Sequence, residues 1–332
     1  MLSARKIEFP QEIFCSGEPK VINFSTRSSS FGCCSRINQH FLKNTIKMNE
    51  ISIIIPHYNN PNGVERLINS IGDQKVEILI IDDQSEESEI SKLKLKINKK
   101  ENVRLLHNFK KKGAGTARNI GIENSTGKWL LFADSDDYYT ENAIEKVLSD
   151  IKETESSSDS REIDIIFYPP TSKIEGSEKK SRRHIEYESL VNNHISSGSN
   201  RIRRRFVVPW SKALRSSLIK KEKILFDETI AANDVMFSLK SGTSARKIKS
   251  SDSVIYCVTD NPNSLTKTKS QRSLKARLLV TIRYNNYISR MGLEKSSQCS
   301  LFSAIYIFCV KQKTANPSHL IKLFIKRRWR IF

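Results

Sequence analysis

The chain has 332 residues, of which 38% are hydrophobic, 12 are glycine and 9 are proline. This composition excludes a disordered, collagenous or low-complexity protein, because enough apolar surface is present to build a core. The length predicts two domains or one large domain. With 56 Lys and Arg residues against 36 Asp and Glu residues, the formal net charge is +20, which favours a negatively charged partner.

The sequence predicts a cytoplasmic protein. Its longest apolar run, Leu301–Val310, is about half as long as a membrane-spanning helix requires. Near the start, Glu8 and Pro10 interrupt any apolar stretch that could serve as a secretion signal. The six cysteines show no C-x-x-C pair and no regular spacing, as is typical of a reducing compartment: Cys15, Cys33, Cys34, Cys257, Cys299 and Cys309.

Residues 1–47 differ from the rest of the sequence. They hold short apolar stretches and the run Ser28–Ser30, without a sustained period of 2 or 3.6. Met48 stands just before the apolar run Ile51–Ile55 and would make a natural start. We therefore expect either a poorly ordered extension or a protein whose translation begins at Met48.

From Ile51 onward, predicted strands and helices alternate. The polar segments Gly63–Ile71 and Ser88–Ile97 are compatible with helices. Short apolar or β-branched runs predict buried strands at Ile51–Ile55, Glu77–Ile81, Val103–Leu106 and Trp129–Ala133. The pattern predicts an α/β fold with a mostly parallel sheet that helices cover on both faces.

The elements beyond the fourth strand follow in the same way. An amphipathic helix with Thr140 as its N-cap precedes a fifth strand at Ile163–Tyr168. Two serine-rich loops and the basic tract Arg201–Arg205 indicate that residues 156–205 are a surface insertion or face an acceptor. The sequence beyond about Gln271 is predicted to be helical, basic and aromatic.

Polar residues follow the ends of three predicted strands, where ligands bind in open parallel sheets. These segments are Pro56–Asn60, Asp82–Ser85 and Asp134–Asp137. Three carboxylates within four residues repel one another unless a cation or solvent relieves them. Mg²⁺ and Mn²⁺ take oxygen ligands together with substrate phosphates. The Asp-Ser-Asp segment therefore predicts either a clamp for a metal ion and a diphosphate or an acidic turn before the next helix.

Eight motifs follow one another in a definite order. They are Ile53–Asn59, Ile80–Ser85, Gly115–Gly121, Gly127–Asp137, Val208–Lys212, Phe226–Glu228, Asn233–Phe237 and Asn263–Thr266. The first four resemble family 2 glycosyltransferases with the GT-A fold, a Rossmann-like sheet flanked by helices. The last four resemble the second half of bacterial capsular and surface-polysaccharide members. The resemblance extends from about Ile51 to Thr268, some two-thirds of the chain.

This resemblance implies an inverting enzyme that moves a sugar from a nucleoside diphosphate sugar to a hydroxyl group. The expected donor is UDP-linked, and the expected acceptor is a glycan or a lipid-linked molecule in surface polysaccharide synthesis. The resemblance also implies that Mn²⁺ or Mg²⁺ is the cofactor. Such a reaction needs stabilisation of the departing diphosphate and a base for the acceptor proton.

Site residues are implied by the matching motif positions. Tyr58 would stack on the base and Asp83 would hydrogen-bond to it, with Pro56 and Asp82 adjacent in the nucleotide site.

The remaining site residues come from later motifs. Asp136 would be the main metal ligand, while Asp134 and Ser135 would contact the ribose or complete the metal shell. Arg118 would lie close to the nucleotide, and an ion pair between Arg118 and Asp83 is one expectation. Asp234 would be the general base. Asn233 replaces the Glu that commonly precedes this base, which puts acceptor contacts carried over from the family in doubt.

Each role has a simpler alternative. Tyr58 could be a core aromatic residue, Arg118 could pair with a surface carboxylate, and Asp234 could be a charge that favours the start of a helix. Trp210 is expected in the core. His57 is expected to be hydrogen-bonded or to face solvent rather than to act in catalysis.

Other functional classes fit the sequence less well. A Rossmann oxidoreductase would need glycine where Arg118 stands, and the segment Gly113–Gly115 follows the third strand rather than the first. A nucleotidyltransferase would need a glycine-rich loop after the first strand. The alternative from a different class is a basic protein that binds nucleic acid or a membrane surface without catalysis. No nucleic-acid-binding motif accompanies the charge, so no nucleic acid partner is expected.

The sequence thus predicts three regions: an extension at 1–47, a GT-A domain at 48–268 and a basic helical segment at 269–332. From Lys311 to Phe332 there is no acidic residue. Basic and aromatic residues favour peripheral attachment to the inner face of an anionic cytoplasmic membrane. Packing of this terminus on the catalytic domain is the alternative.

Overall fold

The computed structural model describes residues 49–156, 163–261 and 270–312, with side chains to Tyr306. The expectations for residues 1–47, for the motif Asn263–Thr266 and for the basic tail beyond residue 312 lie outside the described residues. Among the described helices, none has both the length and the apolar composition needed to cross a membrane.

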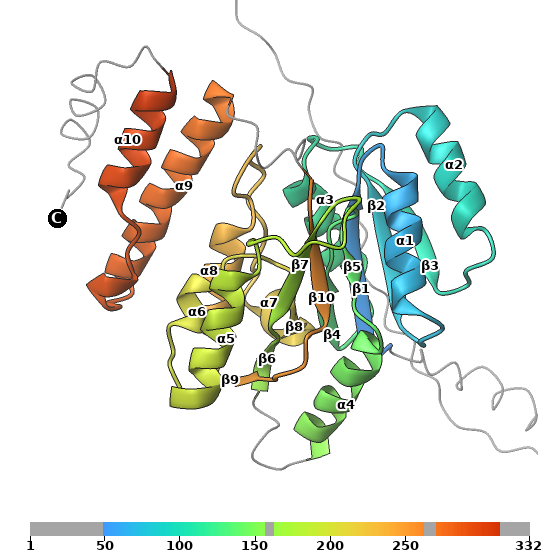
Figure 1. Cartoon of the computed structure of the whole chain (residues 1–332), viewed down its shortest axis with the longest axis horizontal. Coiled ribbons are helices and arrows are strands. Elements are labelled where there is room, and N and C mark those ends of the chain that lie inside the picture. Colours follow the sequence, from blue (N-terminus) through green and yellow to red (C-terminus); the bar gives the residue numbers. More distant parts are fainter. Residues whose placement is uncertain (1–48, 157–162, 262–269, 313–332) are drawn as a thin grey trace, which may run out of the picture. The chain divides into compact units, whose positions relative to one another are not determined.

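A seven-stranded sheet forms the centre of the fold (Figure 1). Its strands, in spatial order, are β3 (Val103–His107), β2 (Glu77–Asp82), β1 (Ile51–His57), β4 (Trp129–Phe132), β8 (Lys212–Arg215), β6 (Ile163–Phe167) and β9 (Lys247–Ser250). The strands β1 to β4 are parallel, β9 is parallel to β6, and β8 runs antiparallel to both β4 and β6. The predicted mostly parallel sheet is confirmed, and the predicted fifth strand joins it beyond β8.

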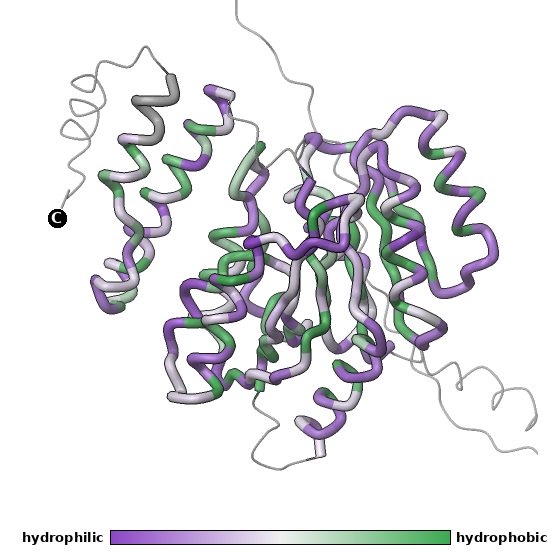
Figure 2. Tube along the Cα trace, in the orientation of Figure 1, coloured by the Kyte–Doolittle hydropathy of each residue, from purple (hydrophilic) through white to green (hydrophobic). Residues whose placement is uncertain are grey.

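Helices cover both faces of this sheet because alternate residues of each strand point to opposite faces. From β1, Ile53 and Ile55 pack in one apolar cluster, and Ile54 packs in another. The first cluster includes α1 (Pro61–Ile71), α2 (Glu87–Ile97) and α4 (Ala143–Ser156), and the second includes α3 (Ala114–Asn124), α5 (Ile185–Ser197), α6 (Ile202–Arg205), α7 (Ser216–Lys221) and α8 (Val235–Ser244). Figure 2 shows the result, with apolar strands inside and polar residues over the outer helices.

A second, three-stranded sheet lies next to the acidic segment. It consists of β5 (Tyr138–Tyr139), β10 (Tyr256–Asp260) and β7 (Pro170–Ile174), with β10 in the middle. Trp210 stacks on Tyr256 with ring centroids 5.6 Å apart, and it is buried as predicted. Because β5 begins directly after Asp137, this sheet fixes one end of the acidic segment.

Two local predictions were wrong. Thr140 does not cap the following helix, which begins at Ala143, because its hydroxyl group donates to the Val254 carbonyl 2.7 Å away. The surface insertion considered for residues 156–205 is wrong for the described residues 163–205, since Ile202 and Val191 are fully buried in the second apolar cluster, while the acceptor-facing alternative stays a prediction. Within the basic tract, Arg203 donates to carbonyls at the end of α8, which is a common role for a basic side chain at a helix C-terminus.

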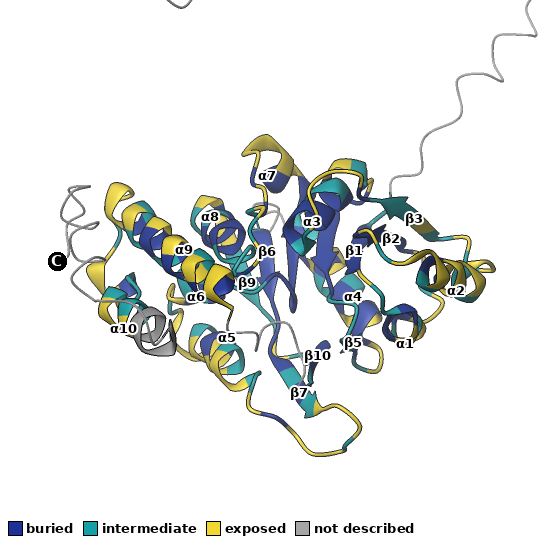
Figure 3. Ribbon diagram, turned by 90° about the horizontal axis from the view of Figure 1, so that it is seen from above, coloured by how far each residue is buried: buried dark blue, intermediate teal, exposed yellow. Residues whose placement is uncertain are grey.

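The predicted helical character beyond Gln271 is confirmed for the described part. The elements are α9 (Gln271–Arg290), the short 3₁₀ helix η3 (Lys295–Ser297) and α10 (Leu301–Gln312). Ser270 caps α9 by accepting from the Ser273 backbone N–H. One face of α9 is buried and the other is exposed (Figure 3). The buried face packs Val280, Tyr284 and Ile288 against α8.

Candidate active site

The three polar segments that follow β1, β2 and β4 lie at the same edge of the sheet. The register aligns His57 at the end of β1 with Asp82 at the end of β2, and aligns Asp82 with His107 in β3. Parallel strands bring their carboxyl ends together, which is where open α/β sheets bind ligands. The location predicted from sequence is therefore the one that the fold provides.

The loops after β1 and β2 are fastened to each other. The Asn59 backbone N–H donates to Ser85 Oγ at 2.9 Å, and the Asn59 side chain accepts from the Glu86 backbone N–H at 2.9 Å. Asn59 and Gln84 have φ values of 48° and 65°, in the left-handed region that few residues other than glycine adopt. Such strain persists only where the surroundings enforce it, and it occurs often at functional sites.

Asp83 is buried and rigidly held. Its Oδ1 atom accepts from Asn108 Nδ2 at 2.7 Å and from the Gly113 backbone N–H at 2.9 Å. No described residue donates a hydrogen bond to its Oδ2 atom, which leaves one oriented acceptor for a ligand. Asn108 was missed from the sequence because its role depends on the pairing of β2 with β3.

Tyr58 projects from the end of β1 and is 44% exposed, so it is not a core aromatic residue. The Lys112 ammonium group lies 3.5 Å from the centroid of its ring, in a cation–π contact. Tyr58 and Lys112 thus form an exposed aromatic and basic pair at the edge of the site. Lys112 was not predicted, because no motif distinguishes it from the neighbouring lysines in the run Lys110–Lys112.

The other residues at these strand ends shape the loops. Asp82 is buried, and its Oδ2 atom accepts from the Ser85 backbone N–H at 3.3 Å, which supports the turn that carries Asp83. Pro56 is a buried residue of β1. The expectation for His57 was wrong: it is buried, neither ring nitrogen has a hydrogen-bond partner among the described residues, and burial lowers its pKa.

The acidic segment after β4 brings three carboxylates together. Oxygen atoms of Asp134, Asp136 and Asp137 lie within 4.8 Å of one another. Asp137 is buried, and each of its carboxylate oxygens already accepts a hydrogen bond, one from the Tyr256 hydroxyl at 2.9 Å and one from the Thr259 backbone N–H at 2.7 Å. The two residues that face the site from this cluster are therefore Asp134 and Asp136.

Asp136 lies in an electrostatic environment that a divalent cation would relieve. Burial and the neighbouring Asp134 carboxylate raise the pKa of Asp136 to about 6, although Arg183 and Arg66 act in the opposite direction. A bound cation favours the charged form of both carboxylates. Ser135 contributes its carbonyl group, which accepts from Asn60 Nδ2 at 3.1 Å and ties the acidic segment to the loop after β1.

Arg118 connects the acidic segment to the second half of the chain. Its guanidinium group donates to Asp134 Oδ1 at 2.5 Å and to Asn233 Oδ1 at 2.9 Å. Asp83 is not its partner, which corrects that prediction. Arg118 is only 5% exposed and lies over the Phe226 ring, so it is not a surface residue paired by chance.

Asp234 occupies the N-cap position of α8, but its side chain makes no capping hydrogen bond. Burial raises its pKa, the charges of Arg118 and Lys212 lower it, and that of Asp134 raises it. The chain makes a turn from Asp227 to Asn233, just before Asp234. The Asp227 backbone N–H closes this turn by donating to the Asn233 carbonyl at 3.0 Å. The fold therefore brings Asp234 into the same electrostatic environment as Asp134.

A glycine allows this turn to approach α3. A Cβ atom at Gly115 would collide with the backbone oxygen of Asp227. Only a residue without a side chain fits between α3 and the turn, and this close approach lets Arg118, one turn later in α3, reach Asn233.

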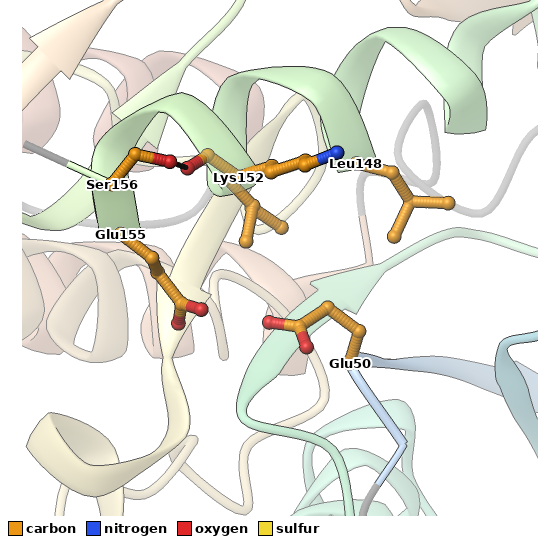
Figure 4. A pocket seen from close by; sticks show the side chains of 6 residues that line it. Glu50, Leu148, Lys152, Glu155 and Ser156 are labelled. Atoms are coloured by element: carbon orange, nitrogen blue, oxygen red, sulfur yellow. Dashed lines mark hydrogen bonds between the residues drawn. The ribbon is translucent and has the colours of Figure 1, made fainter.

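A cavity of about 430 Å³ lies elsewhere, at the opposite edge of the sheet (Figure 4). Glu50, just before β1, and Lys152 and Glu155 in the last turns of α4 help to line it. Lys128 bridges Glu50 and Glu155 at 3.1 and 3.5 Å. These contacts join the start of β1 to the end of α4 and are distant in the fold from the acidic segment.

Comparison with protein families places most of this site within one family model. Residues 52–209 match the model described as glycosyl transferase family 2. Among curated proteins, the uncharacterized glycosyltransferase EpsJ of Bacillus subtilis is 26% identical over 73% of this chain and 71% of its own length. An uncharacterized glycosyltransferase of Rickettsia felis is 34% identical, over 44% of this chain and 26% of that protein.

A third relative is a poly(ribitol-phosphate) beta-glucosyltransferase of Bacillus spizizenii. It is 28% identical over 62% of this chain, and the match covers 32% of its length. This chain therefore spans between about a quarter and about seven-tenths of the lengths of these three relatives.

Solved structures confirm the predicted GT-A fold. A fragment of Staphylococcus aureus TarS (1–349) in complex with UDP-GlcNAc matches with a TM-score of 0.59 and 22% identity, covering 78% of this chain and 70% of that one. The mannosyltransferase PcManGT of Pyrobaculum calidifontis in complex with GDP-Man and Mn²⁺ matches with a TM-score of 0.51 and 11% identity, covering 85% and 81%.

Proposed function

We propose that this chain is a family 2 glycosyltransferase, an inverting enzyme that moves a sugar from a nucleoside diphosphate to an acceptor hydroxyl group. The observation that carries this proposal is the position of Arg118, which bridges Asp134 and Asn233. Through this one side chain, the acidic segment after β4 is joined to the residue that precedes Asp234. The two halves of a transferase site, one for the diphosphate and one for the acceptor, thereby become neighbours.

The nucleotide would bind across the ends of β1 and β2. Tyr58 offers an exposed aromatic face for the base, and Asp83 offers the oriented Oδ2 acceptor described above. Lys112, which covers the Tyr58 ring, would move aside and could then meet the phosphates. We take UDP as the nucleotide, a choice that the TarS complex with UDP-GlcNAc supports by analogy of fold.

A divalent cation fits the residues after β4. Asp134 and Asp136 supply the hard oxygen ligands that Mn²⁺ and Mg²⁺ prefer. A cation between them would offset the repulsion of the two carboxylates and the burial of Asp136. A bound cation would neutralise charge on the departing diphosphate. Arg118 adds a fixed positive charge beside Asp134.

Asp234 would act as the base. As the acceptor oxygen forms its bond to the anomeric carbon, the carboxylate takes the hydroxyl proton. The bond between the anomeric carbon and the diphosphate oxygen breaks, and its electron pair leaves with the nucleotide. Inversion requires that the base and the departing diphosphate lie on opposite sides of the sugar, with Asp234 on one side and Asp136 on the other in this proposal.

We place the acceptor in cell-surface polysaccharide synthesis, as a glycan or a lipid-linked molecule. The name of the poly(ribitol-phosphate) beta-glucosyltransferase supports this class of reaction. Peripheral attachment to an anionic membrane would bring the enzyme to a lipid-linked acceptor.

Calorimetry with UDP tests the donor site. Wild type is expected to bind UDP with Mn²⁺ and to lose most affinity in EDTA, and Asp136→Ala should bind equally weakly in both conditions. Asp73→Ala is the matched control, because Asp73 is exposed and remote from the site. Equal affinity of wild type with and without Mn²⁺ would contradict the metal role, and no binding of UDP or another nucleoside diphosphate would contradict the proposed function.

A further inference from the structure

Lys212 is a buried cation that the site described so far does not use. It begins β8, is 2% exposed, and its Nζ atom donates to the Phe206 carbonyl at 3.3 Å and to Ser238 Oγ at 3.0 Å. Among the residues that the structure describes, no carboxylate lies within ion-pair distance of it. A buried ammonium group with only neutral partners is costly, so a purely structural role would be served better by an apolar side chain.

The hydrogen bonds of Lys212 lead to the start of α8. Ser238, which accepts from Lys212, donates through its backbone N–H to the Asp234 carbonyl at 2.9 Å and through its hydroxyl group to the Val208 carbonyl at 3.2 Å. Lys212 therefore fastens the first turn of the helix that carries Asp234 at its N-cap. A shift of this turn would move the Asp234 carboxyl group.

The ionisable groups around Asp234 come from four segments. Arg118 faces it from α3, Asp134 from the segment after β4, Lys212 from β8, and Tyr187 from α5. The Arg118 guanidinium group already forms an ion pair with Asp134. Lys212 is consequently the cation near Asp234 that no other described carboxylate neutralises.

We propose that Lys212 is a positioning residue for Asp234, whose ammonium group holds the first turn of α8 and keeps the Asp234 carboxylate ionised. This inference rests on the proposed role of Asp234 as the base. Burial lowers the pKa of Lys212 to about 7. Lys212 is therefore charged on the acidic side of neutrality, and this charge opposes the rise in the Asp234 pKa that burial causes.

The test compares Lys212→Met with wild type by two measurements. The first follows the carboxyl-carbon NMR signal of Asp234, assigned by its loss in Asp234→Asn, through a pH titration. The second is the pH profile of kcat for sugar transfer or donor hydrolysis. We expect the Asp234 titration and the acidic limb of kcat to move to higher pH together. Turnover on that limb should fall about tenfold for each pH unit of movement, with little change near pH 8.5.

Two further variants complete the design. Lys212→Gln keeps a hydrogen-bond donor but removes the charge, so it should reproduce the shift if Lys212→Met does not fold. Lys249→Met removes a lysine of β9 that pairs with Asp150 and Glu153 of α4, and it should leave both titrations unchanged. An unmoved Asp234 titration in the folded Lys212 variant would overturn the proposal. If wild type transfers no sugar, the proposed function fails, while the NMR titration still decides the coupling.

Discussion

At the scale of single residues, the site depends on which carboxylates remain free for chemistry. The acidic segment contains three Asp residues in four positions, but Asp137 is bound by Tyr256 and Thr259, which leaves Asp134 and Asp136. Asp234 likewise occupies a helix N-cap without capping the helix. A charged group that the local structure does not need is a candidate for function, because its burial carries a cost that the fold alone does not offset.

The role of Asp234 as base can be tested by Asp234→Asn. General-base catalysis contributes about 10² to 10⁴ in rate, so we expect turnover to fall by that order while affinity for UDP stays near wild type. Asp252→Asn is the control, since Asp252 is exposed. Steady-state kinetics and calorimetry on the same samples check both expectations. Normal turnover in the variant would contradict the role as base and leave Asp234 only as a charge that favours the start of α8.

At the scale of elements, α9 holds the turn that leads to Asp234. Arg283 of α9 donates to both carboxylate oxygens of Asp227, at 2.7 and 3.0 Å, at the point where this turn begins. The turn is closed by the hydrogen bond from the Asp227 backbone to Asn233. The helices beyond the matched family segment thus hold the turn next to the proposed base Asp234.

Arg283→Gln should loosen this turn. Because Arg283 is half exposed, the loss in the free energy of unfolding is expected to be about 1 kcal/mol or less, as urea denaturation can measure. Turnover should fall measurably even though this loss of stability is small, since the turn carries Asn233 next to Asp234. The control is Arg290→Gln, an exposed residue in the last turn of the same helix. Equal turnover in the two variants would show that α9 does not position the turn.

At the scale of the whole molecule, the acidic segment makes stability depend on pH. In the folded protein Asp136 holds its proton up to a pKa of about 6, whereas its ordinary pKa is 3.8. Between these values the unfolded chain binds fewer protons than the folded one. The free energy of unfolding therefore falls as pH rises through this window. The pKa of Asp137 is also raised, by burial and by Asp136, and acts in the same direction.

Asp136→Asn should reduce this decline without abolishing it, because Asp137 remains. Urea denaturation of wild type and variant at pH 4.5 and 6.5 measures the effect, with Asp73→Asn as the exposed control. We expect a smaller loss of stability between the two pH values in Asp136→Asn than in the other two proteins. An identical loss in all three would show that Asp136 has an ordinary pKa in the folded state.

The sequence by itself determined the central strands and the edge of the sheet at which the polar residues gather. Buried parallel strands are nearly continuous apolar runs, so Ile51–Ile55 and Glu77–Ile81 could be read directly. Their carboxyl ends must meet at one edge, which placed Asp83 and Asp136 near each other without coordinates.

Only the tertiary structure decided which side chains act together. Arg118 meets Asn233 across 115 positions of sequence, because β8 inserts between β4 and β6 and brings the start of α8 to α3. The burial of Lys212 follows from that same insertion. No local pattern encodes the spatial order of strands, since it results from the packing of both faces of the sheet at once. For this reason the family motifs marked Asp234, while the surroundings that set its charge became apparent only in the fold.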